Sequence, residues 1–94
     1  MKVGLLTLSF RLPGTETLKA RRSIVKRIIA DVHRLGSSYA VCEVPGEGEL
    51  QELTIRVAHL STDARFTDSA LRRTAERFEH KSAYQVTESS IEML

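Results

Sequence analysis

Hydrophobic and polar positions alternate along the first part of the chain, and this alternation predicts a β-strand over residues 2–12. From residue 4 to residue 12 the even positions are apolar apart from Gly4: Leu6, Leu8, Phe10 and Leu12. Because the side chains of a strand point alternately to its two faces, we expect these even positions to lie in the core. The strand should end at Pro13-Gly14, since proline has no donor for a sheet and glycine tolerates turn geometry.

The pattern then changes to the period of an α-helix over residues 18–35. One broad face of this predicted helix is apolar: Leu18, Ile24, Val25, Ile28, Ile29, Val32 and Leu35. Such a stripe is typical of a helix that lies on a sheet. Thr15 or Thr17 can cap the start of the helix, and Gly36 can end it.

The middle of the chain predicts a β-hairpin. Two stretches with strand-like alternation, 39–44 and 50–61, flank a turn at 45–49 that is rich in glycine and glutamate. In the longer strand, His59 follows the apolar positions of one side, so we expect a hydrogen-bonded histidine in the core.

A second helix and a last strand complete the pattern. Asp63 offers an N-cap for a helix that runs through about residue 81. Phe66 falls off the apolar face of this helix, and we expect it to be exposed. The final strand covers 84–94, and the change of apolar parity near 88–90 predicts either a β-bulge or a strand that frays there.

This order of elements favours one fold. Strand, helix, strand, strand, helix and strand, joined by short loops and right-handed crossovers, predict a ferredoxin-like split βαβ sandwich (βαββαβ) of the α+β class. The four-stranded antiparallel sheet should have the order 4-1-3-2, with two helices on one face. A chain of 94 residues forms one domain, 1–94, because shorter pieces struggle to bury a stable core.

Composition limits the chemistry. The chain is 41% hydrophobic and 28% charged, as in an ordinary globular protein, and its net charge is only +2. A single cysteine, Cys42, excludes an internal disulfide, and its strand parity predicts burial as a small apolar side chain. We predict no metal and no cofactor. The first apolar run is too short to cross a bilayer, and we expect a cytoplasmic protein.

The most distinctive charges are the basic residues of the first helix, in which Asp31 is the only acid. They are our candidates for nucleic-acid binding: Lys19, Arg21, Arg22, Lys26, Arg27 and Arg34. Such a stripe can lie along a phosphate backbone, where each neutralised phosphate releases counterions. It can equally be a solvated face that keeps a small protein soluble. A second basic cluster in the later helix can extend the patch, although acids interrupt it: Arg65, Arg72, Arg73 and Arg77.

Arg21 differs from the other bases because it falls on the apolar side of the helix. A guanidinium there needs a carboxylate partner, so we expect an ion pair with an acid such as Glu43 or Asp63. If Arg21 is instead open beside Pro13-Gly14, it becomes an anion-binding candidate.

The alternative hypothesis is a protein–protein module, in which a second copy of the chain covers the open face of the sheet. The candidate interface residues are apolar: Val3, Leu5, Val41, Ala58 and the exposed Phe66.

The stretch LPGTETLKARRS, followed by IVKRII, resembles the opening of the YlxP-like family of small uncharacterised bacterial proteins. The match continues with YAVCEV and LSTD, so it covers nearly the whole chain, although the hairpin GEGELQEL carries glutamates where that family has aromatic and basic residues. The resemblance implies a ferredoxin-like fold, no known reaction, and a cytoplasmic setting near the translation and ribosome-maturation machinery. RNA or a ribosomal particle is therefore the expected partner.

Two functions associated with this topology do not fit the residues. Acylphosphatases need a glycine-rich phosphate cradle with an arginine in it and a later asparagine, but the loop here is PGTET and the chain has no asparagine. RNA-recognition domains stack bases on aromatic residues of the central strands. The corresponding positions here are Thr7, Ser9, Thr54 and Arg56. We therefore expect a non-enzymatic protein whose contacts with RNA run through helices.

Overall fold

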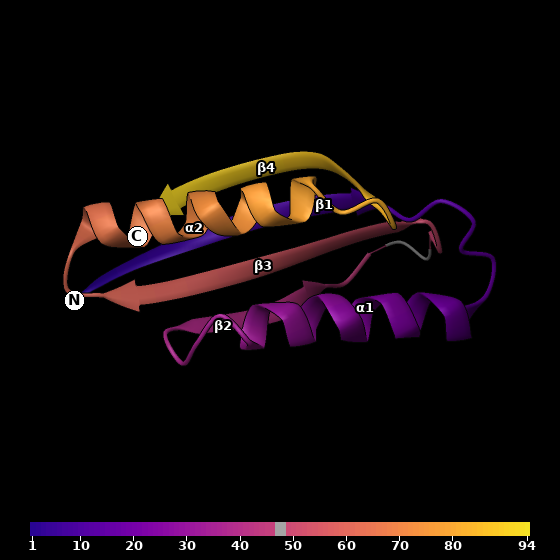
Figure 1. Ribbon diagram of the computed structural model, residues 1–94, viewed down its shortest axis with the longest axis horizontal. Coiled ribbons are helices and arrows are strands. Elements are labelled where there is room, and N and C mark those ends of the chain that lie inside the picture. Colours follow the sequence, from indigo (N-terminus) through magenta and orange to yellow (C-terminus); the bar gives the residue numbers. More distant parts are fainter. Residues whose placement is uncertain (47–48) are drawn as a thin grey trace.

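The protein folds as the predicted α+β sandwich in a computed structural model that describes residues 1–46 and 49–94 (Figure 1). The elements follow one another as β1 (Lys2–Arg11), α1 (Leu18–His33), β2 (Tyr39–Val44), β3 (Glu52–Ser61), α2 (Ala64–Glu79) and β4 (Gln85–Met93). The predicted turn at 45–49 includes residues 47 and 48, which lie outside the described residues.

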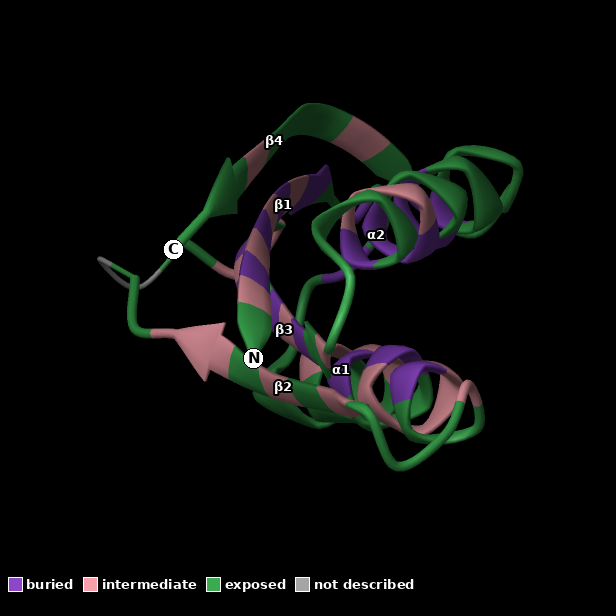
Figure 2. Cartoon of the chain, turned by 90° about the vertical axis from the view of Figure 1, so that its left-hand side faces the viewer, coloured by how far each residue is buried: buried purple, intermediate pink, exposed green. Residues whose placement is uncertain are grey.

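The sheet has the predicted topology. Its four strands are antiparallel neighbours in the order β2-β3-β1-β4, which is the predicted 4-1-3-2 order written from the opposite edge. Both helices cover the same face, and the other face of the sheet is open (Figure 2). The ferredoxin-like architecture is thereby confirmed.

The two helices occupy different parts of the covered face. Helix α2 packs on β1, β3 and β4, whereas α1 packs beside β2 at the edge of the sheet. They are also displaced along the long axis of the molecule, so the start of α1 extends well past the end of α2 (Figure 1).

The core lies between the helices and the even face of β1. Leu6, Leu8 and Leu12 are fully buried, as the alternation predicted. Facing them are apolar side chains from both helices and β3: Val25, Ile28, Val32, Leu53, Ile55, Val57, Leu71 and Phe78. Tyr84 closes one end of this core, where its ring packs edge-on against Phe10 at 5.1 Å between centroids.

Gly4 lets α2 approach the sheet closely. A Cβ at this position would lie 2.7 Å from the Leu71 Cδ1 atom and 2.7 Å from the Thr67 Cγ2 atom. Cβ atoms in folded proteins essentially never make contacts this short, so a larger side chain here would require Leu71 and Thr67 of α2 to shift. The close packing of α2 on β1 therefore requires glycine at position 4, where the apolar pattern of the strand is interrupted.

The predicted bulge in the last strand is also present. The pairing of β1 with β4 shifts register between Ser9 and Phe10, since Ser9 pairs with Glu88 and Phe10 pairs with Val86. Thr87 is the extra residue, and the shift returns Ile91 to the covered side, opposite Leu6. A bulge of one residue exchanges the faces of all later side chains in a strand.

Candidate nucleic-acid interface

Helix α1 begins at a defined cap. The Thr17 hydroxyl accepts a hydrogen bond from the backbone N–H of Ala20 at 3.1 Å. Of the two predicted candidates, Thr15 and Thr17, the N-cap is therefore Thr17. Thr15 is instead buried below the helix start. A fixed start sets which residues of α1 face outward.

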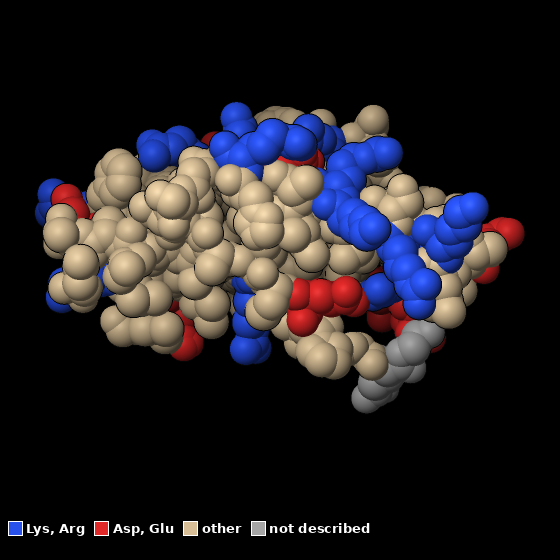
Figure 3. Space-filling view, turned by 90° about the horizontal axis from the view of Figure 1, so that it is seen from below, with Lys and Arg blue, Asp and Glu red and all other residues tan. Residues whose placement is uncertain are grey.

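Three cations form a line on the outer surface of α1. Lys19, Arg22 and Lys26 recur at intervals of three and four residues, which places them on one side of a helix. All three are exposed, and none forms an ion pair with a residue that the structure describes. We call these residues the outer stripe. On the face seen in Figure 3, Lys and Arg side chains form a band across the right-hand half, with acidic side chains beside its lower end.

Arg27 and Arg34 lie on a neighbouring side of α1 together with Asp31. Arg27 is exposed and has no ion-pair partner among the described residues. Arg34 caps the end of the helix through its backbone N–H, and its guanidinium pairs with the Asp31 carboxylate. Arg34 is therefore a partly neutralised member of the predicted basic set.

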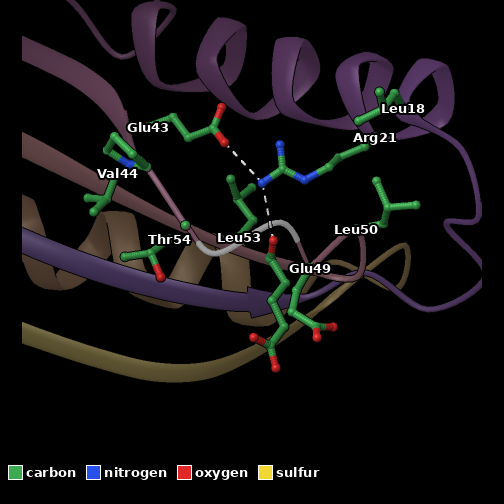
Figure 4. Close-up of a pocket in the computed structure, with 11 residues that line it drawn as sticks. Leu18, Arg21, Glu43, Val44, Glu49, Leu50, Leu53 and Thr54 are labelled. Carbon is green, nitrogen blue, oxygen red and sulfur yellow. Dashed lines mark hydrogen bonds and ion pairs between the residues drawn. The ribbon is translucent and has the colours of Figure 1, made fainter.

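Arg21 points away from the outer stripe and toward the hairpin (Figure 4). Its Nη2 atom lies 2.9 Å from the Glu43 Oε2 atom and donates to the Glu52 backbone carbonyl at 3.2 Å. The Arg21 side chain is 19% exposed and that of Glu43 is 33% exposed. The predicted ion pair is confirmed with Glu43, and Asp63 instead accepts a hydrogen bond from the Arg65 N–H at the start of α2. Arg21 thus ties α1 to β2 and β3.

A pocket of about 420 Å³ lies beside this ion pair. Its lining combines apolar side chains such as Leu18, Leu50 and Leu53 with the acids Glu43, Glu49 and Glu52. Leu18 was expected in the core but is 60% exposed at the border of this pocket, so that prediction is wrong. Leu18 is the first residue of α1, where the helix extends past the strands that cover its later turns.

The second basic cluster, on α2, differs in having local partners. Arg72 donates to the Asp68 carboxylate at 2.7 Å, and this hydrogen bond raises the pKa of Arg72 above its usual value. Arg73 donates to the Ser69 hydroxyl at 3.2 Å. Arg77 lines a cleft together with Arg34 of α1. The two basic clusters therefore come together at the C-terminal ends of the helices.

The five candidate interface residues do not form one surface. Val3, Leu5 and Ala58 share the open face, where Leu5 pairs directly with Ala58. Val41 pairs with the core residue Val57, so it faces the helices and its assignment to the open face is wrong. Phe66 is exposed as predicted, at 54%, but it lies on the helix side.

Leu60 is the open-face residue that the sequence interpretation missed. It pairs with Val3 and is 45% exposed. Its even position in β3, on the same side as Ala58, was the available signal.

Cys42 is exposed, and the prediction that it is buried is wrong. It pairs with Arg56 on the open face, because the odd positions of β2 are the ones that face α1. Both sides of this short strand carry apolar residues, Ala40 and Val44 on one and Tyr39 and Val41 on the other. The alternation alone could not distinguish them.

His59 is a buried, hydrogen-bonded histidine, as predicted. Its Nδ1 atom lies 2.9 Å from the Thr67 hydroxyl, which in turn lies 2.6 Å from the Ser61 hydroxyl. The ring packs between Tyr39 and Phe66, at centroid distances of 4.6 and 5.7 Å. Burial lowers the pKa of His59 below its usual value. This network joins the start of α2 to β3.

Two further features concern the described part of the chain. None of its helices is long and apolar enough to cross a membrane. Among the same residues, no three His, Cys, Asp or Glu side chains are grouped as a metal ion would require.

Comparisons with known proteins agree with the fold and leave the function open. A family model described as "Protein of unknown function (DUF503)" matches residues 3–91. A de novo designed protein, Foldit4, is similar in structure with a TM-score of 0.56 and 16% identity, over 100% of this chain and 97% of that one. At this identity the similarity concerns the fold alone. A search of proteins with curated descriptions finds no match. The YlxP-like name remains a resemblance.

Proposed function

The chain belongs to the DUF503 family, whose function is unknown, and we propose that it binds RNA, free or in a ribonucleoprotein, through the exposed cations of α1. The observation that carries this proposal is the outer stripe of Lys19, Arg22 and Lys26, with Arg27 beside it. These cations are exposed and have no ion-pair partner among the described residues. The proposed role is binding without catalysis.

The arrangement of the stripe suits a polyanion. The three residues span about 10 Å along the helix axis at a rise of about 1.5 Å per residue, so they can contact more than one phosphate of a strand. Each contact releases counterions, which makes binding strongly dependent on salt. An isolated phosphate would gain little from such a line of charges, whereas a nucleic-acid backbone can follow it.

The side chains on the open face of the sheet are not suited to RNA, which favours a contact through α1 instead. Its central positions are Thr7, Ser9, Thr54 and Arg56, and the Ser9 and Thr54 hydroxyls lie 3.0 Å apart in a hydrogen bond with each other. These side chains offer no aromatic surface on which bases can stack. The cationic surface of α1 is the better candidate.

A salt series with paired variants tests the proposal. Binding of a labelled single-stranded RNA oligonucleotide is measured by fluorescence anisotropy for the wild type and for Arg22→Gln/Lys26→Gln. Losing two phosphate contacts should weaken binding and reduce the slope of log K against log salt by about 1.4. The matched control is Arg65→Gln/Arg73→Gln, which removes two charges from α2 and should leave the slope unchanged.

The same experiment can overturn the proposal. A wild-type protein whose binding is independent of salt, or an α1 variant that binds as well as the wild type, contradicts it. Equal loss in both variants shows that total charge, and not the outer stripe, governs the interaction.

A second candidate function, homodimerisation, is favoured by the apolar end of the open face, which now consists of Val3, Leu5, Ala58 and Leu60. The same face carries charges of both signs, including Arg56 and Glu92, so two copies related by a two-fold axis can match opposite charges. Sedimentation of the wild type and of Leu60→Glu tests this. A monomeric wild type at high concentration would contradict it.

A further inference from the structure

A cleft of about 330 Å³ lies between the C-terminal ends of the two helices. Asp31, Arg34 and Leu35 line it from the end of α1. Arg77, Phe78 and Lys81 line it from the end of α2. None of these residues belongs to the outer stripe, so Lys19, Arg22 and Lys26 do not line the cleft.

The charge of this cleft is positive. Arg34, Arg77 and Lys81 face it, and Asp31 is its one acid among the described lining residues. Asp31 is already paired with Arg34, whereas Arg77 and Lys81 have no ion-pair partner among the described residues. Each helix C-terminus contributes about half a negative charge, which together offset about one of the cations. The remaining charge favours an anion.

A fourth cation lies close to the cleft. Arg27, Asp31 and Arg34 recur at intervals of four and three residues, so they share the side of α1 that faces α2. Burial raises the pKa of the Tyr84 phenol, and the nearby positive charge of Arg27 lowers it in part. Tyr84 packs against Phe78, with 6.3 Å between ring centroids. Arg27 therefore adds to the positive potential around Phe78.

The lining also has an apolar part. Phe78 and Leu35 lie among the cations, and Phe78 is almost fully buried. Sites for small molecules have volumes of about 300 to 1,000 Å³ and combine apolar walls with a few directed polar groups. Guanidinium groups bind phosphate oxygens in pairs of parallel hydrogen bonds. The cleft thus combines a phosphate-binding border with a small apolar wall at the half-buried Leu35, behind which Phe78 closes the core.

We propose that the cleft between the helix ends binds a phosphomonoester of nucleotide size, with Arg34, Arg77 and Lys81 on the phosphate and Leu35 against the remainder. Such a group belongs either to a free nucleotide or to the 5′-terminal nucleotide of an RNA. This proposal does not depend on RNA binding by the outer stripe.

The first test uses AMP as the probe and ¹H–¹⁵N spectra of the full chain as the readout. Saturable shifts confined to residues 31–35 and 77–81 are expected, and adenosine, which lacks the phosphate, should produce none. Arg77→Gln removes a charge-assisted hydrogen bond and should raise the Kd for AMP by about tenfold or more. The matched control is Arg73→Gln, one turn away on the same helix, which should change the Kd less than about twofold.

A second measurement distinguishes the two sources of the phosphate. Tighter binding of a 5′-phosphorylated RNA oligonucleotide than of its 5′-hydroxyl form, with competition by AMP, assigns the cleft to an RNA end. Saturable AMP binding with no effect of the 5′ phosphate assigns it to a free nucleotide.

Three outcomes would overturn the proposal: no saturable binding of AMP, equal binding of adenosine, or equal loss in Arg77→Gln and Arg73→Gln. The Arg22→Gln/Lys26→Gln variant keeps the two proposals separate, because it should lose RNA affinity and retain AMP binding.

Discussion

The two helices have the same length, 16 residues, but they differ in how many of their residues are buried. Six residues of α2 are buried, compared with three of α1: Thr67, Ala70, Leu71, Thr74, Ala75 and Phe78, against Val25, Ile28 and Val32. Helix α2 lies on three strands, and α1 lies along the edge strand β2. The core is therefore organised mainly around α2.

The two helices also differ in how many of their basic side chains have bonding partners. On α2, Arg72 and Arg73 bond to side chains one turn earlier, Asp68 and Ser69. On α1, the outer stripe has no such neighbours, and only Arg21 and Arg34 are paired among its described bases. A helix with a shallow contact to the sheet keeps more of its circumference in solvent. This comparison explains why α1 is the better candidate for a binding surface.

The largest expected effect comes from a pair of leucines, one in each helix. Leu71 is fully buried under α2, so Leu71→Ala should lower the free energy of unfolding by about 2–5 kcal/mol. Leu18, in the first turn of α1, is 60% exposed, and Leu18→Ala should change it by less than about 0.5 kcal/mol. Urea unfolding measures both. Equal losses would contradict the division of roles between the helices.

A smaller effect on the free energy of unfolding is expected from the protonation of His59. Because the pKa of His59 is lowered in the folded state, the unfolded chain binds its proton more tightly. The stability that a neutral His59 confers is present above the usual pKa of about 6.5 and is lost as the pH falls toward the folded pKa. The free energy of unfolding should therefore decrease from pH 7 to 5.5, with a slope of at most about 1.4 kcal/mol per pH unit.

Two variants separate this histidine from the others. His59→Gln should remove most of the slope, whereas His33→Gln, on the exposed end of α1, should retain it. The groups packed against His59 are the side chains of Tyr39, Phe66 and Thr67. A slope that persists in His59→Gln would show that another group is responsible.

The smallest effect concerns two of the ion pairs, Arg21–Glu43 and Arg72–Asp68. Glu43→Gln removes the partner of Arg21 and should cost about 1 kcal/mol, since this pair is more shielded than a surface pair. Asp68→Asn removes the partner of Arg72 within α2 and should cost less than Glu43→Gln, because the Arg72 side chain is 66% exposed and solvent screens the pair. Thermal unfolding at low and high salt compares the two. A larger loss for Asp68→Asn would reverse the expected order.

Most of the fold follows from the sequence because the strongest signals are regular. The even positions of β1 could be assigned to the core from alternation alone, and the change of parity in β4 predicted an irregularity near 88–90, where the structure has a bulge at Thr87. The ion pair of Arg21 was predictable because a guanidinium on an apolar stripe requires a partner. These features depend on local pattern and on the cost of burying charge.

The errors share one physical cause. At the edge of the sheet, the neighbouring elements and not the local pattern decide which side chains are covered. Cys42 and Val41 lie on a six-residue strand with apolar residues on both sides, so only the pairing with β3 determines which side is covered. Leu18 fits the apolar stripe of α1 but lies where the helix extends past the sheet. The cleft between the helix ends was not predictable, because its lining joins residues more than 40 positions apart in the chain through the displacement of the two helices.

The position of Cys42 has a practical consequence. As the sole thiol of the chain, on the side of the sheet opposite the helices, it accepts a maleimide fluorophore at one defined point without any engineered cysteine. Quenching or protection of that label should accompany self-association through the sheet and should be absent when a ligand occupies the helical side. One labelled sample therefore reports separately on the two sides of the molecule.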